Sequence, residues 1–129
     1  MNVLLAIYWR DLRLAIDLFL REEPGINVIG VANETESLLA LLKTTHPHVV
    51  LLSWDLPGRT IPEVLSTIHT APAPPRIIVL GNNESEKDTA LAAGADAFLV
   101  KGKPPQHLAA TIREMNLPKN QVQGEEEQQ

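Results

Sequence analysis

Residues 47–58 consist of the sequence PHVVLLSWDLPG, and this stretch decides the fold. Its four consecutive apolar residues, Val49 to Leu52, place apolar side chains on both faces of an extended chain. A short run of this kind predicts a strand buried on both sides, as in a parallel sheet covered by helices. The segment Leu56-Pro57-Gly58 that follows predicts a turn.

The same pattern recurs on both sides of this stretch. The predicted strands cover residues 3–7, 26–31, 49–52, 77–80 and 97–100. Helical spacing of apolar residues fills the intervals, as in Leu12, Ala15, Ile16, Phe19 and Leu20. Helix starts are predicted from an Asp11 cap, from capping boxes at Asn33–Glu36 and Thr60–Glu63, from a Ser85 cap and from Pro104-Pro105. Ends are predicted at Pro24-Gly25, at His46-Pro47, at the loop 71–75 and at Gly94.

Five strands that alternate with five helices imply an α/β domain with a parallel sheet and right-handed crossovers. In such sheets, ligands bind beyond the carboxyl ends of the strands. The residues that follow each strand are therefore the candidates for a functional site: 7–10, 53–58, 81–83 and 101–103.

Composition narrows the class of protein. There is no cysteine, which excludes disulfides and thiolate chemistry, and the histidines have no metal-ligand spacing. The six apolar residues from Val3 to Tyr8 are too few for a signal peptide or a membrane span, so we expect a cytoplasmic location. Net charge is −5; Glu125 to Glu127 against Lys119 give the tail −2 and leave −3 for the body. This weakly acidic body argues against nucleic-acid binding by the domain itself.

Two segments identify a resemblance to a known family. Residues 47–58 are similar to the pattern around the phosphoacceptor aspartate of bacterial response-regulator receiver domains. Residues 94–101, GADAFLVK, resemble the fifth strand of that family with its invariant lysine, here Lys101. The continuation through Pro105 to Arg113 resembles receivers that carry a LuxR-type helix-turn-helix effector. The similarity covers residues 3 to about 115, and it implies a flavodoxin-like, doubly wound sheet of five parallel strands in the order 2-1-3-4-5.

The departures from the family pattern carry the functional interpretation. The acidic pair that holds Mg²⁺ falls on Ile7 and Tyr8, and the phosphoacceptor falls on Ser53. The switch serine or threonine falls on Gly81, so that only Lys101 and the aromatic switch position, Phe98, match the family. Gly81 is expected to leave space beside Phe98 and to provide no hydroxyl that could follow a phosphoryl group.

These replacements remove the chemistry of phosphorylation. Mg²⁺ needs hard oxygen ligands, which isoleucine lacks and a neutral tyrosine supplies poorly. A serine hydroxyl is a much weaker nucleophile than a carboxylate unless a base activates it, and no base is evident in these loops. The resemblance, corrected for these residues, predicts a receiver-like domain that is not an enzyme and needs no metal or cofactor.

Several alternatives stay open at this stage. Asp55 lies two residues beyond Ser53 and is either a displaced phosphoacceptor or a solvated loop carboxylate. Lys101 is either a relic of the phosphoryl clamp or a structural cation paired with Asp55 or Asp11 or exposed to solvent. The aromatic residues Tyr8 and Trp9 with Trp54 and Asp55 are either packing residues or a surface for a peptide or a small molecule.

The prediction is therefore a phosphorylation-independent signalling domain at residues 1–116, followed by a polar segment, 117–129, that is expected to be a disordered tail or linker. We expect the domain to take part in two-component-type signal transduction. It is expected to control transcription through a DNA-binding output that lies outside this chain. The resemblance implies a protein partner or a homodimer, through helix 4, strand 5 and helix 5 or through helices 1 and 5. A small-molecule sensor that uses Tyr8, Trp9, Trp54 and Lys101 is the alternative, and a phosphoacceptor at Asp55 is another.

Overall fold

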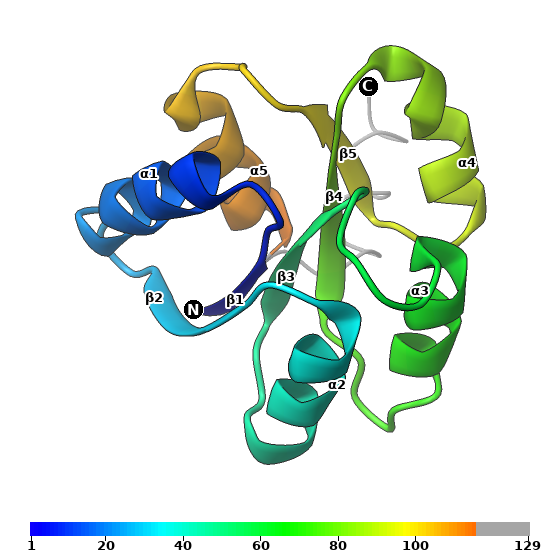
Figure 1. Cartoon of the computed structure of the whole chain (residues 1–129). Helices are drawn as coiled ribbons and strands as arrows, with labels where there is room; N and C mark the ends of the chain where they lie inside the picture. The colour runs from blue at the N-terminus through cyan, green and yellow to red at the C-terminus, as the bar shows by residue number, and fades with distance from the viewer. Residues whose placement is uncertain (116–129) are drawn as a thin grey trace, which may run out of the picture.

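Five parallel strands form the centre of the computed structural model, which describes residues 1–115 (Figure 1). The strands are β1 (Asn2–Ala6), β2 (Asn27–Ala32), β3 (Val49–Ser53), β4 (Arg76–Gly81) and β5 (Ala97–Val100). The helices are α1 (Arg10–Arg21), α2 (Thr35–Thr44), α3 (Ile61–His69), α4 (Lys87–Ala92) and α5 (Pro105–Met115), and a 3-10 turn, η1 (Glu84–Glu86), precedes α4. The predicted tail, 117–129, lies outside the described residues.

The strand order is β2-β1-β3-β4-β5, which confirms the predicted doubly wound topology. All neighbouring strands pair in parallel, and one register shift between Val3 and Leu4 interrupts the β1–β2 ladder. β3 is central, and each of its five residues is buried, as the apolar run predicts. The carboxyl ends of β1, β3, β4 and β5 therefore meet at one edge of the sheet.

Helices α1 and α5 cover one face of the sheet, and α2, α3 and α4 cover the other (Figure 1). The core on the α1 and α5 side contains Leu5 and Leu51, and the core on the α2, α3 and α4 side contains Leu4 and Val50. Successive strand residues thus contribute to opposite cores, because side chains alternate across a strand. No helix among the described residues is long and apolar enough to span a bilayer.

Three predicted helix caps are wrong. Asp11 lies inside the first turn of α1, which begins after Trp9. The Asn33–Glu36 box is not formed, because α2 begins one residue later than that box requires, after Glu34. At the fourth crossover the cap is Asn83 and not Ser85, since the Asn83 side chain accepts a hydrogen bond from the Ser85 amide at 3.0 Å.

The predicted capping box at Thr60–Glu63 is confirmed only in its first half: Thr60 caps α3, with Pro62 in the first turn, but no return bond from the Thr60 amide to the Glu63 carboxylate is found among residues 1–115. The Thr60 hydroxyl accepts a hydrogen bond from the Glu63 amide at 3.3 Å. Gly94 ends α4 with a φ of +115°, a conformation that glycine adopts without strain.

Candidate functional site

The candidate site lies where β1, β3, β4 and β5 end at the carboxyl edge of the sheet. The register pairs Ala6 with Leu52, Ser53 with Leu80 and Gly81 with Val100. The residues at or just beyond these ends are Ile7, Tyr8, Ser53, Gly81 and Lys101. The sheet thus brings all five positions to one edge, although they are spread over 95 residues of sequence.

Ile7 and Tyr8 have opposite environments. Ile7 is completely buried and belongs to the core on the α1 and α5 side. The Tyr8 side chain is 51% exposed. The backbone carbonyl of Ile7 accepts a hydrogen bond from the Arg13 guanidinium at 3.0 Å, which ties this strand end to α1. Only Ile7 fills the interior at this position, and the pair presents no carboxylate.

Ser53 is completely buried at the end of β3. Its hydroxyl oxygen accepts a hydrogen bond from the Tyr8 amide at 2.9 Å. This contact joins the ends of β1 and β3 just beyond their last backbone pair. The hydroxyl therefore has a structural partner in a place where solvent does not reach it, and no general base among residues 1–115 forms a hydrogen bond with it.

Replacing Ser53 with alanine is expected to lower the free energy of unfolding by about 1–3 kcal/mol, because the Tyr8 amide loses its acceptor. Urea denaturation at constant pH measures the change. Ser37→Ala is the matched control, since the Ser37 hydroxyl bonds only to the exposed Glu34 carboxylate; its loss should stay within about 0.5 kcal/mol. Equal, small effects of the two variants would contradict the structural role of Ser53.

Lys101 contacts an aromatic ring. Its ammonium nitrogen lies 4.0 Å from the centroid of the Trp9 ring, a cation–π geometry that contributes about 0.5–1 kcal/mol at an exposed site. Within residues 1–115 Lys101 forms no ion pair, so the suggested pairing with Asp55 or Asp11 is wrong. Its backbone amide donates to the Gly81 carbonyl at 2.9 Å.

Asp55 is exposed but has a specific partner. Its carboxylate accepts a hydrogen bond from the Asn82 side-chain amide at 2.6 Å. The loop after β3 is thereby joined to the loop after β4. No group of three or more potential metal ligands gathers in the described part of the chain.

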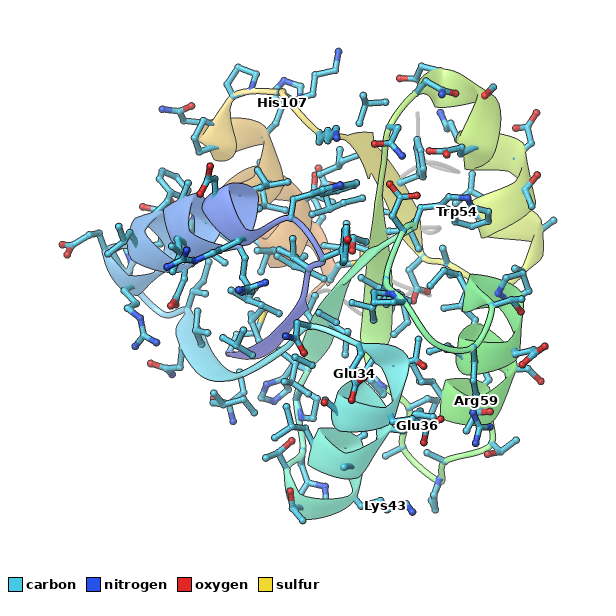
Figure 2. All side chains as sticks on the ribbon, viewed as in Figure 1. Glu34, Glu36, Lys43, Trp54, Arg59 and His107 are labelled. Carbon is cyan, nitrogen blue, oxygen red and sulfur yellow. The ribbon has the colours of Figure 1, made fainter. Side chains whose placement is uncertain are left out.

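The aromatic residues do not form one surface. Trp9 packs against the core on the α1 and α5 side, whereas Trp54 packs against the core on the opposite side, near α4 (Figure 2). Tyr8, which directly precedes Trp9 in the sequence, is exposed. The sheet thus separates Trp9 from Trp54, two of the four side chains that the sensor hypothesis needs to bring together.

Gly81 does not leave an open space beside Phe98, contrary to the expectation from sequence. A β-carbon at position 81 would lie 2.4 Å from the Phe98 ring and 2.5 Å from the Glu86 carboxylate. The Phe98 ring and the Glu86 carboxylate therefore occupy the space that a side chain at position 81 would need. Sequence reasoning missed Asn82 and Glu86, although the spacing of Asn83 and Glu86 matches a capping box.

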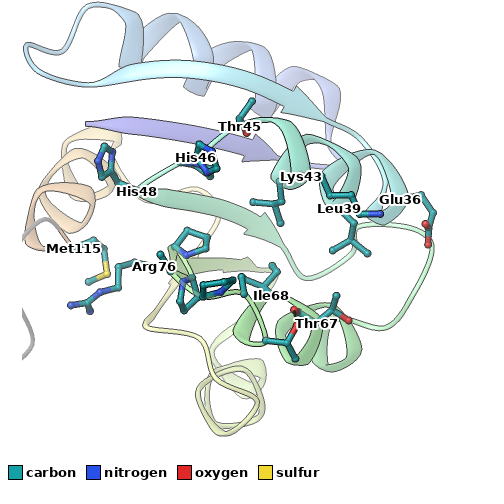
Figure 3. Close-up of a pocket in the computed structure, with 18 of the residues that line it drawn as sticks. Glu36, Leu39, Lys43, Thr45, His46, His48, Thr67, Ile68, Arg76 and Met115 are labelled. Atoms are coloured by element: carbon teal, nitrogen blue, oxygen red, sulfur yellow. Dashed lines mark hydrogen bonds between the residues drawn. The ribbon is translucent and has the colours of Figure 1, made fainter.

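A cavity of about 1030 Å³ lies away from this edge (Figure 3). It is bordered by α2, α3 and the loops that precede β3 and β4, including the predicted loop 71–75. A smaller cavity of about 100 Å³ lies between α1 and α5 and is lined in part by Lys101. Tyr8, Trp9 and Trp54 line neither cavity, so neither is the pocket that the sensor hypothesis requires.

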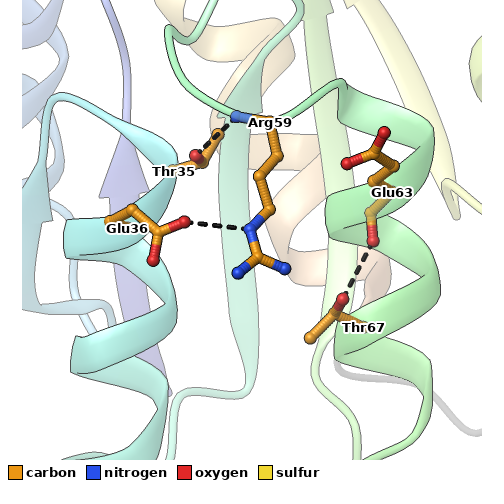
Figure 4. A network of polar contacts seen from close by, with 5 residues as sticks. All are labelled: Thr35, Glu36, Arg59, Glu63 and Thr67. Atoms are coloured by element: carbon orange, nitrogen blue, oxygen red, sulfur yellow. Dashed lines mark hydrogen bonds and ion pairs between the residues drawn. The ribbon is translucent and has the colours of Figure 1, made fainter.

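One ion pair joins the start of α2 to the residues just before α3, at the edge of the 1030 Å³ cavity (Figure 4). The Arg59 guanidinium lies 2.9 Å from the Glu36 carboxylate, and the Arg59 amide donates to the Thr35 hydroxyl at 2.9 Å. Both side chains of the ion pair are largely exposed, so the pair contributes about 0–1 kcal/mol. The buried Thr35 is the firmer part of this junction.

Comparison with known proteins gives a consistent set of relatives. The response regulator receiver domain family matches residues 9–113. The nitrate/nitrite response regulator protein NarL of Escherichia coli (strain K12) is 30% identical over 105 residues, which cover 80% of this chain and 49% of NarL. The response regulator UvrY of the same strain is 32% identical over 114 residues, which cover 87% of this chain and 52% of UvrY. The chain thus spans about half the length of these curated relatives.

Solved structures agree on the fold. A LuxR-family DNA-binding response regulator from Staphylococcus aureus superposes with a TM-score of 0.81 at 21% identity, covering 90% of this chain and 98% of the other. The signal receiver domain of a putative response regulator NarL from Mycobacterium tuberculosis gives 0.80 at 23% identity, covering 88% and 93%. At these identities, the likeness supports the flavodoxin-like fold alone.

Proposed function

The chain belongs to the response regulator receiver domain family, and we propose that it is a member that signals without being phosphorylated. Ile7 and Ser53 carry the proposal. Positions that need carboxylates for Mg²⁺ binding and phosphoryl transfer hold a core isoleucine and a buried serine whose oxygen already accepts the Tyr8 amide. Restoring the chemistry would require replacing packed interior groups and not only exposed ones.

The retained lysine supports the same proposal. A lysine that clamps a phosphoryl group must present its ammonium to the acceptor residue. In this chain the Lys101 ammonium lies over the Trp9 ring instead. Lys101 acts here as a packing cation that covers the start of α1, and it has no anionic partner among residues 1–115.

In this proposal the domain, residues 1–116, is a non-enzymatic module that acts by binding proteins. Its curated relatives are response regulators about twice its length, and we propose that the output is a DNA-binding domain outside this sequence. Association with a partner then takes the place of phosphorylation as the signal.

A homodimer through α1 and α5 is the favoured protein contact. Leu14 and Leu18 lie one turn apart on α1 and are 47% and 70% exposed. Two neighbouring exposed leucines on one helix face are typical of an interface, since residues four apart share a face. On the competing face, Leu91 of α4 is 38% exposed and has no such neighbour among the exposed large apolar residues of the described part, 1–115.

Sedimentation velocity tests this proposal. The purified chain is expected to sediment as a dimer, with an unchanged profile when beryllofluoride and Mg²⁺ are added at constant ionic strength. Leu18→Glu should shift the profile toward monomer, because it places a charge in the interface core. Leu91→Glu is the control on the other face and should leave the dimer intact.

Three results would count against the proposal. A dimer that forms only with beryllofluoride would identify a working phosphate switch. A monomeric wild-type chain would exclude the homodimer. Dissociation by Leu91→Glu and not by Leu18→Glu would move the interface to the α4 face.

A further inference from the structure

The loop after β4 is organised around one carboxylate. One oxygen of Glu86 accepts hydrogen bonds from the backbone amides of Asn82, at 2.6 Å, and Asn83, at 3.4 Å. The Asn83 side chain in turn accepts the Ser85 amide, which completes a capping box at η1. The two backbone amides that follow β4 are therefore already hydrogen-bonded to an anionic group of the chain itself, the Glu86 carboxylate.

The same carboxylate borders the Phe98 ring. An ideal β-carbon on Gly81 would lie 2.5 Å from the Glu86 oxygen, and 2.4 Å and 2.6 Å from two ring carbons of Phe98. Real β-carbons essentially never approach other atoms this closely. The φ of Gly81 is not positive, so this glycine is required for the space it leaves and not for its backbone conformation.

Phe98 is partly buried on the side of the sheet that α2, α3 and α4 cover. Its ring packs against the core beneath α2, α3 and α4. β5 pairs directly with β4 at this level, with Val79 opposite Phe98 and Gly81 opposite Val100. The ring, the glycine and the carboxylate therefore share one small volume between two neighbouring strands and the start of α4.

We propose that Gly81, Glu86 and Phe98 form a lock that fixes the aromatic ring in its inward position. The Glu86 carboxylate holds the loop after β4 by accepting hydrogen bonds from two backbone amides of that loop. The absence of a side chain at Gly81 leaves room for the Phe98 ring. The regulatory role of this lock rests on the proposed function. In a receiver that cannot be phosphorylated, the lock keeps one arrangement of the face formed by α4 and β5. Partners at that face then meet a constant surface.

A simpler account is that Glu86 only caps the helix. In that account, removing Glu86 weakens the first turn of α4 and leaves the Phe98 ring where it is. A side chain at Gly81 would then act through steric crowding alone, and Phe98 would not respond to Glu86. The position of the ring in a Glu86 variant therefore separates the two accounts.

The ring can be observed directly, because the chain has only two phenylalanines, Phe19 and Phe98. NMR of protein labelled with ring-¹³C phenylalanine should show one Phe98 environment in the wild type, assigned with Phe19→Leu. Gly81→Ala and Glu86→Ala should each shift the Phe98 resonances toward a solvent-exposed environment or add a second set. Glu84→Ala, an exposed acid in the same turn, should leave them unchanged.

Melting temperatures supply a second readout in case Gly81→Ala is poorly folded. Gly81→Ala is expected to lower Tm by about 5 °C or more through overpacking. Phe98→Leu removes the two crowded ring carbons, so Gly81→Ala should cost less than half as much in that background. Equal costs in both backgrounds would overturn the lock.

Unchanged Phe98 resonances in Glu86→Ala, or two exchanging Phe98 environments in the wild type, would overturn the lock as well. Neither result would bear on phosphorylation. Conversely, uptake of a phosphoryl group by the wild-type chain would refute the proposed function and would leave the geometry of the lock as it is. The failure of one proposal is thus distinguishable from the failure of the other.

Discussion

Ile7→Asp is expected to lower the free energy of unfolding by about 3–5 kcal/mol, because it places an unpaired carboxylate in the core under α1 and α5. Ile7 is completely buried among apolar side chains that include Leu5 and Ile16. The Arg13 guanidinium already donates a hydrogen bond to the Ile7 carbonyl at 3.0 Å. Urea denaturation of the two proteins measures the difference.

Ile7→Val is the matched control for the lost volume. It removes one methylene without adding charge, so its expected cost is about 0.5–1.5 kcal/mol. If Ile7→Asp cost no more than Ile7→Val, position 7 would be accessible to water and able to hold a metal-ligating carboxylate. The structural basis for the proposed loss of Mg²⁺ binding would then fail.

Gly58→Ala is the second substitution with a large expected effect: it should lower the free energy of unfolding by about 2–4 kcal/mol. Gly58 has a φ of +116°, which strains any residue with a side chain. A β-carbon there would also lie 2.1 Å from the hydroxyl of the buried Thr35. That threonine joins α2 to the loop after β3 through the Arg59 amide and the Pro57 carbonyl.

Gly102→Ala separates the two causes. Gly102 has a φ of +94°, and no atom lies within 4 Å of its ideal β-carbon. Gly102→Ala should therefore lower the free energy of unfolding only through backbone strain, by about 1–2 kcal/mol. Thermal or urea unfolding of the two variants compares them directly. Equal losses would show that Thr35 moves aside at no cost and that the Thr35 junction is not rigid.

The sheet could be predicted from sequence because its signal is local. Val49 to Leu52 and Ile77 to Leu80 are unbroken apolar runs, and the structure places them in the central strand β3 and its neighbour β4. The caps were harder to predict, since several polar residues compete at each helix start. Asn83 lies two residues before Ser85, and the backbone conformation that selects one of them is set by the loop after β4 and not by residue type.

The site could be predicted only in part, for the same reason. The sequence predicts which positions meet at the edge of the sheet, because parallel strands end together. It does not predict the partners of each side chain, which depend on packing across the sheet. The Lys101 contact with Trp9, the Asn82 contact with Asp55 and the filling of the Gly81 space by Phe98 all join residues distant in sequence.

The central claim is that this receiver does not take up phosphate, and mass spectrometry of the intact chain tests it most directly. The chain is incubated with Mg²⁺ and acetyl phosphate or phosphoramidate, and a relative with an intact site serves as the positive control. The account predicts an unchanged mass for this chain while the control gains one phosphoryl group. A gain of one phosphoryl group on Ser53 or on Asp55 would contradict it.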